Sequence, residues 1–149
     1  MLDPFSVDYG EIRGMLSAFA ELSFQGTPDI HFSFDFEYLQ KLETVQATLE
    51  AYTHKWAETV TIVPLASWKA TLQKALETWL FGNLLLPEFS KPYKHSIIEH
   101  IIDKIEHLVR PTAVWRVDIK PKGFYELEWE DFSLENEKAV FLLHLGFSD

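Results

Sequence analysis

The sequence predicts a single α+β domain in which about four helices pack on a three- or four-stranded antiparallel sheet. Two observations predict this class. Apolar residues recur at spacings of three and four in several segments over about residues 6–109, which is the period of a helix with one buried face. Over about residues 114–146 the pattern changes to strand-like alternation, which predicts a C-terminal β-meander. At 149 residues, the chain 1–149 has the length of one domain.

The N-terminal segment predicts a helix that begins near Ser6 or Asp8, either of which can cap it, and ends near Ser23. Its apolar stripe consists of Ile12, Met15, Leu16, Phe19 and Leu22. Residues 30–36 then alternate between large apolar and polar side chains, which indicates a short strand. This strand is the uncertain fourth member of the sheet.

The next two helices are predicted from shorter stripes. One of about five turns carries Leu42, Val45, Leu49, Tyr52 and Trp56, and the other, from about residue 65 to 82, carries Trp68, Leu72, Leu76 and Trp79. Because each lies on an apolar stripe, we expect Trp56, Trp68 and Trp79 to be buried where these helices face each other. The β-branched run 59–63 between them is interpreted as a connection with some extended character, with a brief strand as the alternative.

The fourth helix, over about 93–109, combines an apolar stripe with the best candidate chemistry in the chain. Side chains that can bind a divalent metal lie on its other face: His95, Glu99, His100, Asp103, Glu106 and His107. Yet no second helix offers a matching His-Glu pair, and Lys94, Lys104 and Arg110 lie among them, as on a solvated surface. We therefore expect no metal and no cofactor. A small enzyme or metal-binding protein using this face is the alternative.

The C-terminal third predicts three antiparallel strands joined by turns at 121–123 and 135–138. In the first hairpin, the basic residues Arg116 and Lys120 are expected to lie across from Glu126 or Glu128. Such pairs can neutralise part of the acidic segment that follows, but not all of it.

The middle strand of this meander contains a change of phase. Tyr125, Leu127 and Trp129 alternate with glutamates, but Asp131 then stands where an apolar residue is due, which predicts a β-bulge around residues 130–131. The last strand, 139–145, is apolar on both faces and is therefore expected to be central. His144 is its single ionisable residue.

Charge and composition exclude several function classes. The net charge is −10, and residues 123–149 contain one basic and seven acidic side chains, so this segment repels phosphate and disfavours nucleic-acid binding. The absence of cysteine excludes disulfides, thiolate metal sites and cysteine nucleophiles. Without a secretion-signal pattern or an apolar run of about 20 residues, we expect a cytoplasmic protein with no membrane partner.

Motifs for catalysis are also missing from the sequence. The six glycines form neither a phosphate-binding loop nor a dinucleotide fingerprint, and there is no Gly-x-Ser-x-Gly elbow. Ser96 and His100 share a helix face but lack a third group to orient the imidazole. These observations predict a protein that is not an enzyme.

A small, cysteine-free, strongly acidic α+β chain that contains Trp129-Glu-Asp-Phe132 and ends in Leu143-His-Leu-Gly-Phe-Ser-Asp149 resembles the immunity proteins of bacterial toxin systems, including those of contact-dependent inhibition. The resemblance implies a non-enzymatic domain that binds a cognate toxin domain, often a basic nuclease, and blocks its active site or substrate groove. An adaptor subunit of a larger assembly is another alternative. The residues expected to meet the partner are the C-terminal carboxylates Glu126, Glu128, Glu130, Asp131, Glu135 and Glu137.

Overall fold

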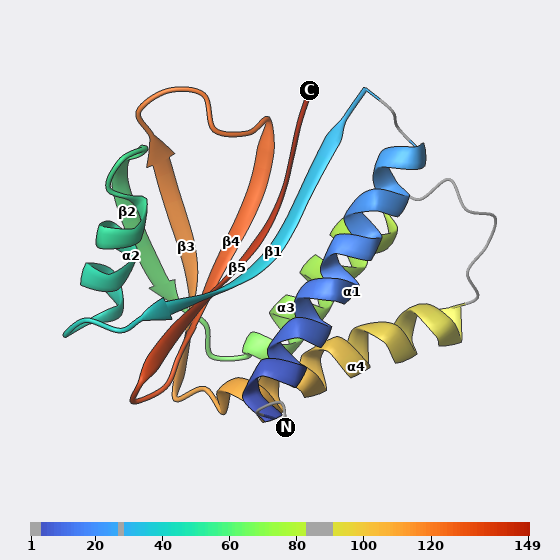
Figure 1. The fold of residues 1–149 in the computed structure, drawn as a ribbon, viewed down its shortest axis with the longest axis horizontal. Helices are drawn as coiled ribbons and strands as arrows, with labels where there is room; N and C mark the ends of the chain where they lie inside the picture. The colour runs from blue at the N-terminus through green and yellow to red at the C-terminus, as the bar shows by residue number, and fades with distance from the viewer. Residues whose placement is uncertain (1–3, 27–28, 83–90) are drawn as a thin grey trace.

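A computed structural model describes residues 4–26, 29–82 and 91–149. Figure 1 shows an α+β architecture, as the sequence predicts, in which the described residues form four α-helices and a five-stranded antiparallel sheet. The elements in chain order are α1 (Pro4–Gly26), β1 (His31–Gln40), α2 (Val45–Thr53), β2 (Ala57–Pro64), α3 (Trp68–Leu76) continued by a π-helical turn (Glu77–Phe81), α4 (Lys91–Val109), β3 (Ala113–Pro121), β4 (Glu128–Glu135) and β5 (Ala139–Ser148).

The sheet order is β1-β5-β4-β3-β2, so the three C-terminal strands are consecutive neighbours and the predicted meander is confirmed. The strand expected over 30–36 is β1, which pairs along its whole length with β5 and places β5 inside the sheet. The interpretation of residues 59–63 as a connection is wrong. These residues belong to β2, whose Val60 and Ile62 lie opposite Ile119 and Val117 of β3 and pack with the apolar side chains of that strand.

Helices cover the two faces of the sheet unequally (Figure 1). α1, α3 and α4 lie together on one face, where the large core includes Ile12, Leu76, Ile101, Phe132 and Phe141. α2 lies on the opposite face, over a smaller core that comprises Leu39, Val45, Leu49, Ala57, Val60, Val117, Ile119, Val140 and Leu142. That second face is therefore only partly covered.

This arrangement corrects the predicted tryptophan cluster. Trp68 and Trp79 belong to the large core, whereas Trp56 packs with the smaller core on the other side of the sheet, so the three rings do not meet. Of the three, Trp79 is buried, with 8% of its surface exposed. The sequence pattern predicted that each stripe faces a core but could not tell which core.

α2 is also shorter than predicted, with nine residues instead of about five turns. The Thr44 side chain caps it by accepting a hydrogen bond from the Ala47 N–H at 3.0 Å. Leu42 precedes the helix and is half exposed, and Trp56 follows it and stacks on Tyr125. The predicted helix was too long because Leu42 and Trp56, which lie outside α2, continue the spacing of its apolar stripe.

The bulge predicted at residues 130–131 is absent, because β4 pairs with both neighbours without a change in register. Phe132 and Leu134 face the large core, while Asp131 and Ser133 lie on the opposite face and are buried polar residues. The change of phase in the sequence therefore reflects a carboxylate inside the protein.

The ion pairs predicted for the first hairpin are wrong as well, since Arg116 pairs with Glu130 at 2.5 Å and Lys120 with Glu58 at 3.0 Å.

The β4–β5 turn, predicted at 135–138, is held by Asn136. Its side-chain oxygen accepts the N–H groups of Lys138 and Ala139, both at 2.9 Å, in an Asx-type turn. Its side-chain amide donates to the carbonyl of Val109 at 2.8 Å and so ties the end of α4 to the hairpin.

Among the described residues, no helix combines the length and the apolar character needed to cross a membrane.

Candidate functional site

A buried histidine stands at the centre of the partly covered face. His144 of β5 is the cross-strand neighbour of Asp131 of β4, and its Nδ1 lies 2.6 Å from Asp131 Oδ1. On the other side of the ring, Nε2 lies 3.0 Å from Glu126 Oε2. The exposed fractions of these side chains are 13% for His144, 10% for Glu126 and 0% for Asp131. One imidazole thus connects two carboxylates away from water.

Glu126 comes from the segment between β3 and β4, which crosses this face. The segment is fixed at both ends, because the Lys122 N–H donates to the carbonyl of Trp56 at 2.8 Å and the Leu127 N–H donates to that of Phe147 at 2.9 Å. A Cβ at residue 146 would collide with the Glu126 carboxylate, so Gly146 leaves the space through which the carboxylate reaches the imidazole.

These contacts fix the charge state of the site. Burial by itself lowers the pKa of His144, but the hydrogen bonds and charges of Asp131 and Glu126 outweigh that effect and raise the pKa to about 9. His144 is therefore an imidazolium at neutral pH. Burial raises the pKa of Asp131 despite the hydrogen bond from His144, and Asp131 Oδ2 has no hydrogen-bond partner among the described residues.

Two hydroxyl groups complete the network. The Tyr125 hydroxyl lies 3.1 Å from His144 Nδ1, and the Ser33 hydroxyl lies 3.1 Å from Nε2 while it donates a short hydrogen bond to Glu126. Ser33, His144 and Asp131 follow one another like the nucleophile, base and orienting acid of a hydrolase. The protonation is opposite, however, because the imidazole already holds its proton and the hydroxyl proton is directed to Glu126.

Beside this network a pocket of about 260 Å³ opens on the same face. Its lining residues come from β1, the end of α2 and the residues that follow it, the β3–β4 segment and β5: Asp35, Glu37, Tyr52, Trp56, Tyr125, Leu142 and His144. The pocket combines aromatic walls with carboxylates, and the His144 ring forms part of its lining. None of these seven residues is among the six carboxylates that are expected from the sequence to meet a partner.

The six carboxylates expected to meet a partner do not form one continuous surface. Glu126 and Asp131 are buried around His144, and Glu130 accepts the indole N–H of Trp79 at 2.9 Å besides its ion pair with Arg116. The two that are exposed, Glu128 and Glu137, lie at opposite ends of β4, roughly 25 Å apart from the rise of a strand.

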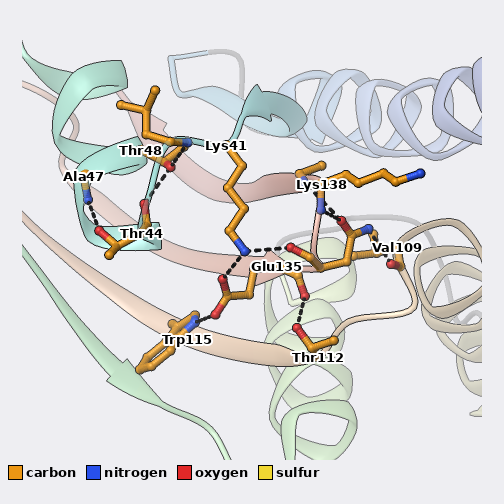
Figure 2. A network of polar contacts seen from close by, with 12 residues as sticks. Lys41, Thr44, Ala47, Thr48, Val109, Thr112, Trp115, Glu135 and Lys138 are labelled. Atoms are coloured by element: carbon orange, nitrogen blue, oxygen red, sulfur yellow. Dashed lines mark hydrogen bonds and ion pairs between the residues drawn. The ribbon is translucent and has the colours of Figure 1, made fainter.

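Glu135 is held inside a separate network, which Figure 2 shows. Its carboxylate pairs with Lys41 at 3.1 Å and accepts the indole N–H of Trp115 at 3.2 Å, and its backbone carbonyl accepts the N–H of Thr112 at 2.8 Å. Lys41 also donates to the carbonyl of Asn136 at 2.9 Å. These contacts join the ends of β1, β3 and β4, so Glu135 stabilises the fold.

The polar face of α4 is used mainly for packing between helices. His100 and Lys104 contact Glu11 of α1 at 3.1 and 2.9 Å, and Glu106 pairs with Lys69 of α3. His95 lies 3.5 Å from Glu99, while Asp103 and His107 are exposed. Within the described residues, no group of three histidine or acidic side chains is arranged to hold a metal ion.

Comparisons with protein-family models, with curated proteins and with solved structures found no match. The functional inference therefore depends on the geometry of the site. In the sequence, the signal for this site was weak but present: Asp131 interrupted an apolar phase, and His144 was the one ionisable residue in a strand apolar on both faces.

Proposed function

We propose that this protein is a non-enzymatic, acidic binding domain of the immunity type, which neutralises a cognate bacterial toxin in the cytoplasm by covering a basic active site or substrate groove. The observation that carries the proposal is the acidic, aromatic-lined pocket on the partly covered face of the sheet. A pocket of this kind offers ring surfaces, which are enriched at protein-binding surfaces, and carboxylates that complement the charge of a basic partner.

The overall charge supports the same kind of partner. At −10, the chain attracts a basic protein over a distance set by the ionic strength and accelerates its association at low salt. Among the residues expected to act in this way, Glu128 and Glu137 are free to do so because they are exposed. Asp131, Glu126, Glu130 and Glu135 contribute instead by shaping the fold behind the surface.

The closed state of the His144 network supports binding over catalysis. A general base must accept a proton near neutral pH, but His144 has a pKa of about 9 and is already paired with two carboxylates. Ser33 correspondingly has no free imidazole to accept its proton, because His144, 3.1 Å from the hydroxyl, already holds its own. The same contacts are what a rigid binding surface needs, because they lock the side chains that line the pocket.

The direct test is co-expression with the C-terminal toxin domain encoded by a neighbouring gene. We expect this chain to restore growth of cells that produce the toxin domain and to co-elute with it in size-exclusion chromatography. A chain that neither restores growth nor forms a complex with that domain would contradict the proposal.

Association kinetics add a matched comparison. We expect Glu128→Lys/Glu137→Lys to slow association with the toxin domain, most strongly at low salt. The double variant Glu77→Lys/Glu99→Lys makes the same change in net charge at exposed positions on the helical side of the molecule, and it should slow association less. Equal effects of the two double variants would show that steering depends on net charge and not on the predicted carboxylates.

A further inference from the structure

The pocket beside His144 has the size of a site for one side chain. Its volume of about 260 Å³ lies below the roughly 300–1,000 Å³ of pockets that hold whole small molecules. α2 covers this face of the sheet only in part (Figure 1). The pocket is open on this face, so a group projecting from another protein can enter it.

Aromatic rings form one side of the pocket. Trp56 and Tyr125 are stacked, with ring centroids 4.4 Å apart, and Trp129 lies edge-on to Tyr125 at 5.1 Å. The hydrogen bond between the Tyr125 hydroxyl and His144 fixes the tyrosine ring, and Tyr52 projects from the last turn of α2. Ring faces held in this way attract cations through their quadrupoles.

Carboxylates of β1 form the opposite rim, and one of them already binds a guanidinium. Arg13 of α1 reaches over this edge strand, donates two hydrogen bonds to Asp35, at 3.0 and 3.3 Å, and lies 3.4 Å from Glu37. Glu37 lines the pocket and Arg13 does not, and a carboxylate that contacts one cation through one oxygen can accept further hydrogen bonds. Asp35 and Glu37 of this strand can thus accept hydrogen bonds from a planar guanidinium, as their contacts with Arg13 illustrate.

The negative charge around the pocket exceeds the positive charge. Four carboxylates, Asp35, Glu37, Glu126 and Asp131, stand against two cations, Arg13 and His144. Burial and the charge of Asp35 raise the pKa of Glu37, and burial with the charges of Glu37 and Asp35 raises that of Tyr52. Burial is the larger cause of both shifts, and the charges of the carboxylates, the second cause, are what a further cation would offset.

We propose that this pocket binds an arginine side chain of the protein partner, with the guanidinium against the rings of Trp56 and Tyr125 and paired with Glu37. The proposal deepens the proposed function and rests on it for the identity of the partner. A guanidinium fits better than an ammonium because it is planar, stacks on rings and donates in a fork. A metal ion fits less well, since the described residues offer no group of three ligands.

The test uses the isolated protein, so that its result does not depend on the toxin. In ¹H–¹⁵N NMR spectra, L-argininamide should shift the indole N–H signal of Trp56 in a saturable way, while L-citrullinamide, which has the same α-amino group but a neutral side chain, should not. Glu37→Gln should weaken the apparent affinity by about fivefold or more, because a charge-assisted hydrogen bond is lost. Glu43→Gln, an exposed glutamate outside the pocket, should leave it unchanged.

Equal shifts with argininamide and citrullinamide, or no saturable shift, would overturn the proposal, as would an unchanged affinity in Glu37→Gln. A stronger response to L-lysinamide would overturn the assignment of arginine. Any of these results combined with toxin neutralisation would reject the pocket while the proposed function stands. Conversely, argininamide binding without neutralisation by the chain would reject the proposed function and leave the arginine-binding pocket established.

Discussion

The carboxylate of Glu126 occupies the space that a side chain at residue 146 would need. Gly146 is buried in β5, and a Cβ built on it would collide with Glu126 and lie 3.0 Å from His144 Nε2. No described glycine has a positive φ, so residue 146 requires glycine for space and not for backbone conformation. A single missing side chain thus lets a carboxylate from a connecting segment pair with a strand histidine.

Gly146→Ala should therefore displace Glu126 and lower the free energy of unfolding by roughly 1–3 kcal/mol, because His144 and Ser33 then lose the carboxylate that they contact. Urea denaturation measures this change. Gly123→Ala is the matched control, because nothing lies within 4 Å of a Cβ at residue 123. A loss of stability as large in the control as in Gly146→Ala would refute the role assigned to residue 146.

His144→Ala should destabilise the protein by about 3–5 kcal/mol, because it leaves two buried carboxylates without their cation. The control is His100→Ala, which also removes an imidazole next to a carboxylate, Glu11, but at the surface, where the side chains are 52% and 38% exposed. We expect that change to cost less than about 1 kcal/mol. Chemical denaturation of both variants compares the two environments, and similar losses would be inconsistent with a buried ion-pair network.

Stability should fall as the pH rises from about 6.5 to 9. The folded protein keeps the His144 proton up to a pKa of about 9, whereas the unfolded chain loses it near the ordinary histidine pKa of 6.5. The stabilisation is therefore complete below the lower pKa and is lost as the pH rises through the higher one. The total change is on the order of 3 kcal/mol. Unfolding curves across this range should show the decline in wild type and in His31→Gln, an exposed-histidine control, and a much weaker decline in His144→Gln. A flat wild-type profile would exclude the raised pKa.

Much of the fold was predictable because long amphipathic patterns depend on local chemistry. The stripe of α1 and that of α4 predicted both helices, and the alternation of β1 predicted its strand. β2, which makes five strands instead of the expected three or four, was considered only as an alternative, because residues 59–63 are a short run whose extended state depends on pairing with β3, a partner more than 50 residues away. Its outer side chains, such as Val63, are exposed and give the run no clear alternation.

The site was less predictable because its residues come together through register. Asp131 was expected at the surface since carboxylates usually are, and its pairing with His144 follows only from the β4–β5 alignment. Glu126 belongs to an irregular segment, and the pocket joins it with β1 and α2, which are distant in sequence. The sequence thus identified the segment that contains the site. It did not predict that Glu126 and Asp131 of this segment lie inside the protein.

Two of the three tryptophans expected to form one core, Trp79 and Trp68, should differ in their contribution to stability. Trp79 is buried, and its indole N–H is bonded to Glu130, so Trp79→Ala should cost about 3–5 kcal/mol. Trp68 is partly exposed at the start of α3, and Trp68→Ala should cost clearly less. Thermal melts of the two variants test the assignment, and equal drops in melting temperature would argue against the packing described for these rings.

The protonation state of His144 decides between two descriptions of the site. A protonated ring makes it a closed, ion-paired binding scaffold, and a neutral ring makes it a site with a free base. Long-range ¹H–¹⁵N NMR correlations of the imidazole ring, recorded from pH 5 to 10, measure this protonation state. We predict the signature of an imidazolium at pH 7, with both ring nitrogens protonated, and a titration midpoint near 9. A neutral ring at pH 7 with a midpoint at or below 6.5 would contradict the account and make Ser33, His144 and Asp131 a candidate catalytic group.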